Sequence, residues 1–289
     1  MEMCQTLSSG MNIIEFTFLV AIGSFLAGLL GSLTGLGGGV VLVPLLTIFF
    51  KVDIRYAIGA SLVSVIATSS GAAAAYVKEG FSNIRIGMFL EIATTLGALG
   101  GAFLAAFVST KALAIIFGLT LLYSAYLSRK PRTREQRNLP PDALATKLKM
   151  NGSFPSEEGG MRHYNVQRVP AGFGLMFGAG ALSGLLGIGS GAVKVLAMDQ
   201  TMKMPFKVST TTSNFMIGVT AAASAGVYLA RGYIDPGLAM PVMLGVLSGS
   251  LLGARILVKA QTRVLRWVFS VVIVVLGAEM IYKGLLGHI

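Results

Sequence analysis

Long apolar stretches alternate with short polar segments along almost the whole chain. A helix needs about 20 apolar residues to cross the hydrocarbon core of a bilayer, and most of the stretches reach or approach that length. They cover residues 13–33, 39–50, 54–77, 86–108, 113–127, 171–186, 192–198, 206–230, 238–258 and 264–286. The pattern predicts an all-α polytopic membrane protein.

One polar segment near the middle is much longer than the others. Residues 129–168 carry nine lysines and arginines together with proline, serine and glutamate, a composition typical of a solvated, partly disordered linker. It divides the chain into an N-terminal membrane repeat (1–128), a basic linker (129–168) and a C-terminal membrane repeat (169–289).

The two membrane halves match each other in sequence. Shifted by 152 residues, the chain aligns with itself without gaps from about residue 27 to residue 117. Gly28 then falls on Gly180, and Gly97 falls on Gly249. A register kept over that length indicates a tandem duplication.

The basic residues indicate how the spans are oriented. If the linker is cytoplasmic, the loops on its side carry 16 lysines and arginines, and the segments on the other side carry 5. This bias follows the positive-inside rule. Equivalent loops differ in their charge, so we predict two inverted repeats of four or five spans each. The short stretches 39–50 and 192–198 leave two alternatives open, a span or a re-entrant segment.

Composition agrees with the membrane assignment and argues against an enzyme. Charged residues are only 12% of the chain, about half the usual share of a soluble domain, and the net charge of +11 is explained by loop topology rather than by nucleic acid. Cys4 is the sole cysteine, and the two histidines are His163 in the linker and His288 at the end. With no P-loop signature either, we expect no catalytic residue, no metal and no cofactor.

Glycine clusters interrupt the apolar pattern at matching places in both repeats. The first reads Gly35-Leu36-Gly37-Gly38-Gly39 and the second Gly187-Ile188-Gly189-Ser190-Gly191. Such clusters break a helix, and broken backbone in a membrane is tolerated only against protein or a water-filled cavity. A helix that restarts there directs free N–H groups and its positive dipole end at that cavity, which favours an anion. The alternative is that the glycines only allow close helix packing.

The residues that follow the first cluster carry a family resemblance. They are Val43-Pro44-Leu45-Leu46 and Ala57-Ile58-Gly59-Ala60-Ser61 with Thr68-Ser69. Together with the duplicated layout, they resemble the sulfite exporter TauE/SafE family, also called the toluenesulfonate uptake permeases. The resemblance implies a membrane transporter for sulfite or sulfur-containing organic anions. The second repeat departs from the motif, with Lys194 at the position equivalent to Leu42.

Polar side chains inside the spans are further candidates. An ammonium as costly as that of Lys194 marks a functional position, unless the side chain snorkels to an interface. The cluster Thr212-Ser213-Asn214 can donate hydrogen bonds to an anion, the alternative being contacts between helices. Glu91 and Asp199 are candidates for carrying a coupling proton, the alternatives being an interfacial position for Glu91 and an ordinary loop position for Asp199.

The predicted function is secondary transport of a small anion, with proton coupling as an option, across the cell inner membrane. One repeat would rock against the other in alternating access. The expected partners are the anionic substrate and the lipid bilayer, with a homodimer left open. The alternatives are an anion channel and a membrane sensor or assembly protein that acts through its basic cytoplasmic linker. The predicted substrate-binding residues are Gly35, Gly37, Gly38, Gly39, Ser61, Gly187, Gly189, Ser190, Gly191, Lys194, Thr212, Ser213 and Asn214.

Overall fold

The computed structural model describes residues 12–34, 38–78, 82–129, 142–156, 160–257 and 262–287. Long helices dominate these residues, and five of them are long and apolar enough to cross a membrane. The predicted all-α polytopic class is therefore confirmed, with one small β-hairpin added in the linker.

Each repeat contains one short helix between longer ones. The N-terminal repeat comprises α1 (Ile13–Thr34), α2 (Gly39–Ile48), α3 (Ile54–Lys78), α4 (Ile84–Leu104) and α5 (Thr110–Arg129). The C-terminal repeat comprises α7 (Val169–Leu186), α8 (Gly191–Leu196), the π-helical turn η2 (Ala197–Thr201), α9 (Phe206–Ala230), α10 (Pro236–Leu257) and α11 (Thr262–Leu286).

The helix ends differ from the apolar stretches where polar residues cap them. Apolarity alone places the start of the fourth span at residue 86, but α4 begins at Ile84. The Asn83 side chain accepts a hydrogen bond from the Ile86 backbone N–H at 3.2 Å. An Asn at this position satisfies a donor that the first turn of a helix leaves free, so the helix extends beyond the apolar run.

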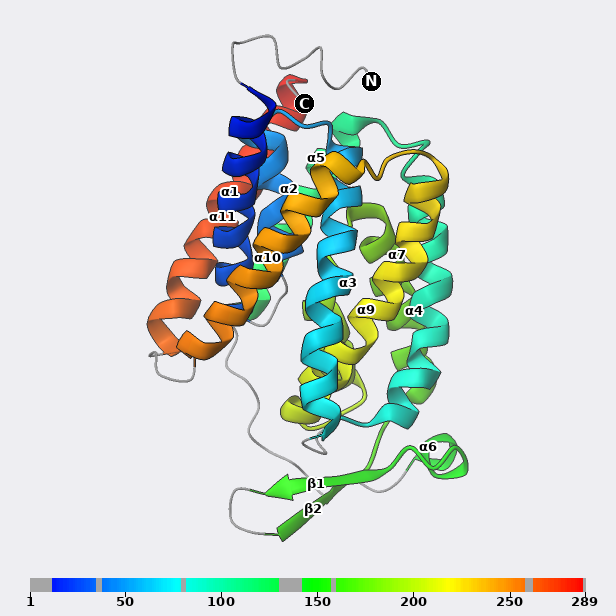
Figure 1. Ribbon diagram of the computed structural model, residues 1–289. Helices are drawn as coiled ribbons and strands as arrows, with labels where there is room; N and C mark the ends of the chain where they lie inside the picture. The colour runs from blue at the N-terminus through cyan, green and yellow to red at the C-terminus, as the bar shows by residue number, and fades with distance from the viewer. Residues whose placement is uncertain are drawn as a thin grey trace.

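Helices of the two repeats pair with each other rather than within their own half. α1 packs on α10, α4 packs on α7, and the central helices α3 and α9 lie against each other. Because α7 is the equivalent of α1 and α10 the equivalent of α4, exchanging the repeats reproduces the same pairs. In Figure 1, α3 runs away from the end that holds both termini and α9 runs back towards it. Such opposite directions are what an inverted duplication requires.

Glycines set how closely these pairs approach. A Cβ added to Gly180 on α7 would lie 2.1 Å from the Thr94 carbonyl oxygen on α4, and one on Gly184 would lie 2.0 Å from that of Ala98. In the α1–α10 pair, a Cβ on Gly28 would lie 2.3 Å from the Val246 carbonyl oxygen. Small residues four apart allow such backbone contact between membrane helices. The glycine pattern therefore fixes the two inter-repeat pairs.

The short helices do not cross a bilayer by themselves. At 1.5 Å per residue, the ten residues of α2 reach about 15 Å, half of a hydrocarbon core, and α8 is shorter still. Figure 1 shows α1 and α3 starting at the same end of the molecule. The chain thus runs away from this end through α1 and back towards it through α2, an arrangement that favours the re-entrant alternative, which stays a prediction.

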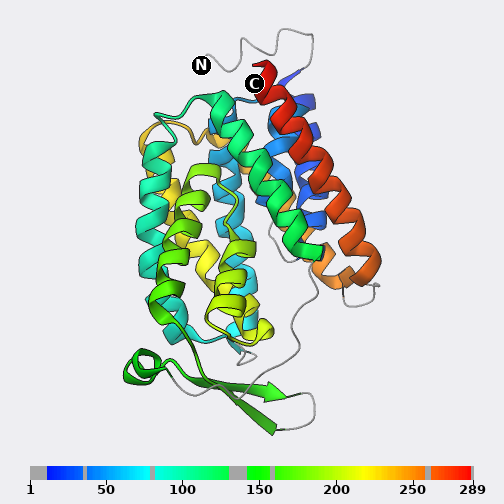
Figure 2. The same ribbon diagram turned by 180° about the vertical axis from the view of Figure 1, so that it is seen from behind.

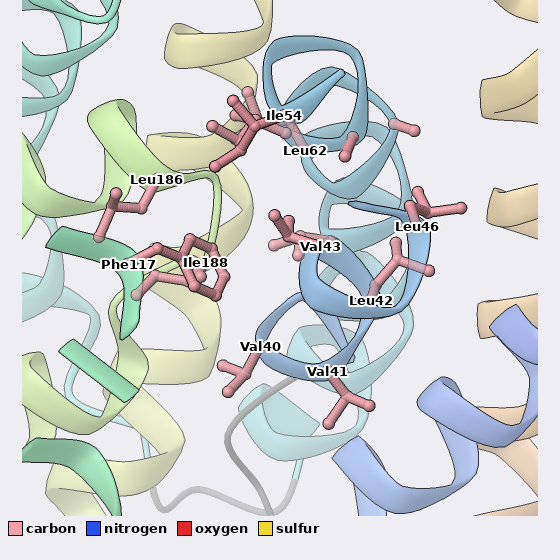
Figure 3. Packing of buried hydrophobic residues seen from close by; sticks show 14 of the residues in the cluster. Val40, Val41, Leu42, Val43, Leu46, Ile54, Leu62, Phe117, Leu186 and Ile188 are labelled. Carbon is pink, nitrogen blue, oxygen red and sulfur yellow. The ribbon is translucent and has the colours of Figure 1, made fainter. Parts of the chain in front are cut away.

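The first hydrophobic core surrounds α2. Its members include Val40, Val43 and Leu46 of α2, together with Phe117 of α5 and Ile188 from between α7 and α8. Figure 3 shows Val40 and Val43 pointing towards the side where Ile188 and Phe117 lie, with Leu46 on the opposite side of α2. The short helix of one repeat therefore shares its core with the interruption of the other.

The expectation of a wholly solvated linker is wrong for its second part. Residues 142–168 form α6 (Ala143–Lys147) and an antiparallel hairpin of β1 (Gly152–Ser156) and β2 (Gly160–Tyr164). Met150 and Val166 are fully buried in a second core that also contains residues of α4, α7 and η2. Figure 2 shows this hairpin lying across the end of the helices opposite the termini. The composition of the segment did not predict this packing, because its few apolar residues are outnumbered by charged and polar ones.

A hydrogen-bond cluster at Asn83 attaches the hairpin to both repeats. Asn83 Nδ2 donates to the Tyr164 hydroxyl at 2.7 Å and to the Met150 carbonyl oxygen at 3.1 Å. Its backbone N–H donates to Thr212 Oγ1 on α9 at 3.1 Å. Burial raises the pKa of Tyr164 above its ordinary value, more than the bond from Asn83 lowers it.

Replacing Tyr164 with phenylalanine should weaken the docking free energy of the hairpin on the helices by about 1 kcal/mol, the net value of one buried hydrogen bond. Since the folded-state pKa is raised, docking of the native hairpin keeps its full strength below the ordinary tyrosine range and weakens as the pH rises through the higher value. Limited proteolysis of the linker measures both effects. In the phenylalanine variant, protease sensitivity should no longer increase at alkaline pH. A variant in which it still increases would show that Tyr164 is not the titrating group.

Candidate functional site

The second glycine cluster breaks the helix as predicted. α7 ends at Leu186, and the backbone takes left-handed φ values of +67° at Gly187, +70° at Gly189 and +44° at Ser190 before α8 begins. Glycine adopts this region without a steric penalty, whereas a serine there is uncommon. In the first repeat, α1 ends at Thr34 and α2 starts at Gly39; Gly35 and Gly37 lie outside the described residues.

The two interruptions meet beside α3. Ser61 Oγ on α3 donates a hydrogen bond of 2.8 Å to the Gly187 carbonyl oxygen in the second repeat. A Cβ added to Gly39 would lie 2.6 Å from Ser61 Oγ and 3.2 Å from that same carbonyl oxygen. The start of α2 and the end of α7 are therefore in contact, although they are almost 150 residues apart in sequence.

The equivalent serine on α9 lies against the second interruption. Ser213 Oγ is 3.4 Å from the Gly191 carbonyl oxygen, a longer and weaker contact than that of Ser61. Ser190 is 4% exposed, and among the described residues its Oγ has no hydrogen-bond partner. A buried hydroxyl without a partner costs free energy, so Ser190 is a donor available to a bound anion.

Lys194 lies in a buried polar network with Thr220 and Glu91. Its side chain is fully buried, and Nζ donates to Thr220 Oγ1 at 2.5 Å. Thr220 Oγ1 is in turn 2.7 Å from Glu91 Oε1, which also accepts from Thr95 Oγ1 at 3.1 Å. The snorkelling alternative therefore does not describe Lys194. Glu91 is 8% exposed and is joined to a basic residue through Thr220; its depth in the membrane stays a prediction.

The remaining predicted residues lie in different places. Gly38 is the residue before α2, and its backbone carbonyl accepts from the first turn of that helix. Thr212 is buried, but its hydroxyl accepts from Asn83 near the hairpin. Asn214 is half-buried, and Asp199 is half-buried within η2. Of the described predicted residues, the structure thus brings the glycines from Gly38 onward, the three serines and Lys194 to the interruptions and leaves Thr212 at the hairpin.

Two arginines at the opposite end were not singled out from sequence. Arg55 and Arg231 line a small pocket together with Tyr228 and Tyr233. Arg231 Nη1 donates to the carbonyl oxygens of Ala102 and Phe103, at 3.3 and 3.1 Å. The Tyr228 hydroxyl donates to the Leu185 carbonyl oxygen at 3.2 Å, two residues before the interruption begins at Gly187. The few positive charges of these two segments, Lys51 and Arg55 in one and Arg231 in the other, gave no signal that the two arginines converge.

The arrangement can hold a small anion but offers no metal chemistry in the part of the chain described. No group of three or more histidine, cysteine, aspartate and glutamate side chains gathers among the described residues. The groups near the interruptions are hydrogen-bond donors: the backbone N–H groups of Gly39 and Val40, which come before the first bonds that Val41 and Leu42 make to the Gly38 carbonyl oxygen, the Ser190 hydroxyl and the Lys194 ammonium. Donors without a neighbouring metal ligand set suit an oxyanion.

Comparison with known proteins points in the same direction. The family model for the sulfite exporter TauE/SafE matches residues 20–280. The probable membrane transporter protein YunE of Bacillus subtilis is 30% identical over 279 residues, which cover 94% of this chain and 99% of that protein.

Two further relatives carry the same kind of name. They are the probable membrane transporter proteins YdhB of Bacillus subtilis, 26% identical over 82% of this chain and 89% of its own, and MJ0441 of Methanocaldococcus jannaschii, 26% identical over 93% and 98%. No solved structure matches at a comparable level. All three relatives are named as membrane transporters and not as enzymes, in line with the expectation from sequence.

Proposed function

Because this chain belongs to the sulfite exporter TauE/SafE family of multi-pass membrane transporters, we propose that it moves sulfite or an organosulfonate across the cytoplasmic membrane. The anion would bind between the two helix interruptions. It would accept hydrogen bonds from backbone N–H groups and Ser190 and face the ammonium of Lys194. The linker would lie on the cytoplasmic side.

The contact between the interruptions is the observation that carries this proposal. Ser61 Oγ bonds to the Gly187 carbonyl oxygen, so the broken backbone of both repeats shares one location. Unpaired backbone donors inside a membrane need a polar partner, and an oxyanion supplies several acceptors at once. A role in helix packing alone explains Gly180 and Gly184, but it does not explain the left-handed turn at Ser190 or its unpartnered hydroxyl.

Alternating access would follow the helix pairs rather than the repeats. A movement of one repeat against the other would separate α4 from α7 and α1 from α10, whose backbones touch at the glycines. Two bundles with members from both repeats, α1–α2–α10 and α7–α8–α4, keep those contacts intact. Rocking of one bundle against the other about α3 and α9 would open the interruptions to each side in turn.

Thermal stabilisation by sulfur oxyanions tests this proposal. At least one of sulfite, thiosulfate, sulfate, taurine and sulfoacetate should raise the melting temperature of the purified protein. A ligand that binds only the folded state stabilises it by mass action. Lys194→Ala should abolish the gain, and Ser190→Ala should reduce it. The rate of anion uptake into proteoliposomes should saturate as the anion concentration rises. Absence of stabilisation by every anion would contradict the substrate class, and sustained conductance would favour a channel.

A further inference from the structure

Glu91 and Lys194 form a buried pair of opposite charges that a single hydroxyl bridges. Thr220 Oγ1 is 2.5 Å from Lys194 Nζ and 2.7 Å from Glu91 Oε1. Glu91 Oε2, although buried, has no hydrogen-bond partner among the described residues. The carboxylate is therefore held by one oxygen, and its other oxygen is available to a proton.

Lys194 is the nearest opposite charge that the helices around Glu91 provide. α7 contains no titratable residue, and α4 itself adds only Arg85, which donates to the Lys149 carbonyl oxygen at the exposed end of the helix. On α9 the titratable residues are Lys207 and Tyr228, about 20 and 12 Å along the helix from Thr220. Asp199 lies in η2, after α8. The charge balance of this buried site therefore depends on Glu91 and Lys194.

We propose that Glu91 is a built-in counter-anion, which the transported anion displaces from Lys194 as Glu91 takes up one proton. This deepens the proposed function and rests on it. Without substrate, the carboxylate and the ammonium sum to zero. With a monovalent anion beside Lys194 and the proton on Glu91, the sum is again zero. Binding an anion with both groups charged would leave one uncompensated negative charge in a low-dielectric site, which is costly.

The site that the duplication relates to Glu91 and Lys194 indicates why one proton accompanies each anion. At the positions equivalent to Lys194 and Glu91 stand Leu42 and Met243. Thr68, the equivalent of Thr220, bonds to carbonyl oxygens of its own helix, those of Ser64 and Val65. Of the two sites related by the duplication, only the one at Glu91 and Lys194 holds a charged pair. It provides one carboxylate for one ammonium.

Proton uptake on anion binding is the decisive measurement. Purified protein in weakly buffered solution is titrated with methanesulfonate and with ethanesulfonate, monovalent anions whose charges stay constant over about pH 5 to 8, while a pH indicator counts protons. The wild type should take up about one proton per bound anion, and Glu91→Gln should bind with an uptake near zero. Apparent affinity should fall up to tenfold per pH unit in the wild type and stay level in the variant.

Matched variants separate coupling from folding. Glu279→Gln removes a half-exposed carboxylate that pairs with Lys283 at 3.8 Å and should leave the proton count at one. Thr220→Val should disturb the pH dependence of binding and Thr220→Ser should restore it, while Thr68→Val should have no such effect. If Glu91→Gln does not fold, infrared spectra of the wild type still decide, since anion binding should produce the C=O band of a protonated carboxyl.

The possible failures are distinguishable. A wild type that binds neither anion in this assay, nor any anion of the thermal panel, counts against the proposed function itself. A wild type that binds without proton uptake, or a Glu91→Gln variant that keeps the uptake, would overturn the role of Glu91 and leave anion transport standing. Loss of binding in a folded Glu91→Gln variant would also overturn it, because a displaced group is not needed for affinity.

Discussion

Lys194→Leu by itself should destabilise the protein by about 3–5 kcal/mol, the usual cost of leaving one member of a buried charge pair without its partner. Glu91 would remain 8% exposed with its neighbouring ammonium gone. Adding Glu91→Met should recover most of the loss, since apolar residues of similar volume often replace a buried ion pair without cost. Melting temperature in detergent measures both steps.

The pair of positions related to Glu91 and Lys194 by the duplication provides the template for this double variant. Leu42 and Met243 already occupy the equivalent positions, and Leu42 is fully buried in the first hydrophobic core. The double variant should therefore fold and lose anion binding and transport. A double variant as unstable as Lys194→Leu would mean that the pair is not coupled, and one that transports at the native rate would remove Lys194 from the site.

Gly180→Ala should also destabilise the protein, through a backbone clash rather than through charge. The added methyl group would lie 2.1 Å from the Thr94 carbonyl oxygen, well inside van der Waals contact, so α7 and α4 would have to separate. Overpacking of this kind costs about 1–3 kcal/mol and occasionally more, and here it displaces a whole helix pair. The yield of folded protein and its melting temperature are the measurements.

Gly178 on the same helix is the control. A Cβ there would meet nothing within 4 Å, so Gly178→Ala should be neutral or stabilising by up to about 1 kcal/mol, the difference in helix propensity. Because both substitutions add the same atom to α7, a difference between them reports contact with α4. Equal stability of the two variants would contradict the close packing of these helices.

Most of the helical framework could be predicted from hydropathy, because it depends on local composition. Residues 206–230 coincide with α9 at both ends, and the stretch 54–77 differs from α3 by one residue. Other boundaries shifted by a few residues, and at the start of α4 the cause is a polar residue, Asn83, that bonds to the backbone of the first turn. The second interruption was also accessible, since only glycine adopts left-handed backbone freely at Gly187 and Gly189.

The hairpin in the linker shows where local composition fails. Residues 142–168 are basic and polar in sum, yet Met150, Phe154, Tyr164 and Val166 are buried at the end of the helices. Four apolar side chains spread over such a segment produce no hydropathy signal. Their burial depends on a surface built by α4, α7 and η2, which lie elsewhere in the sequence.

By itself the sequence determined that this chain is a duplicated, helical membrane protein with two interruptions, because hydrophobic length, glycine clusters and an internal register are properties of short segments or of their repetition. Only the tertiary structure decided that α4 pairs with α7 and that Glu91 meets Lys194 through Thr220. In the first contact, Gly180 lies against Thr94, 86 positions earlier (180 − 94), and in the second, Glu91 and Lys194 are 103 positions apart (194 − 91). Both contacts arise from how the helices of one repeat dock on the other, which no local pattern records.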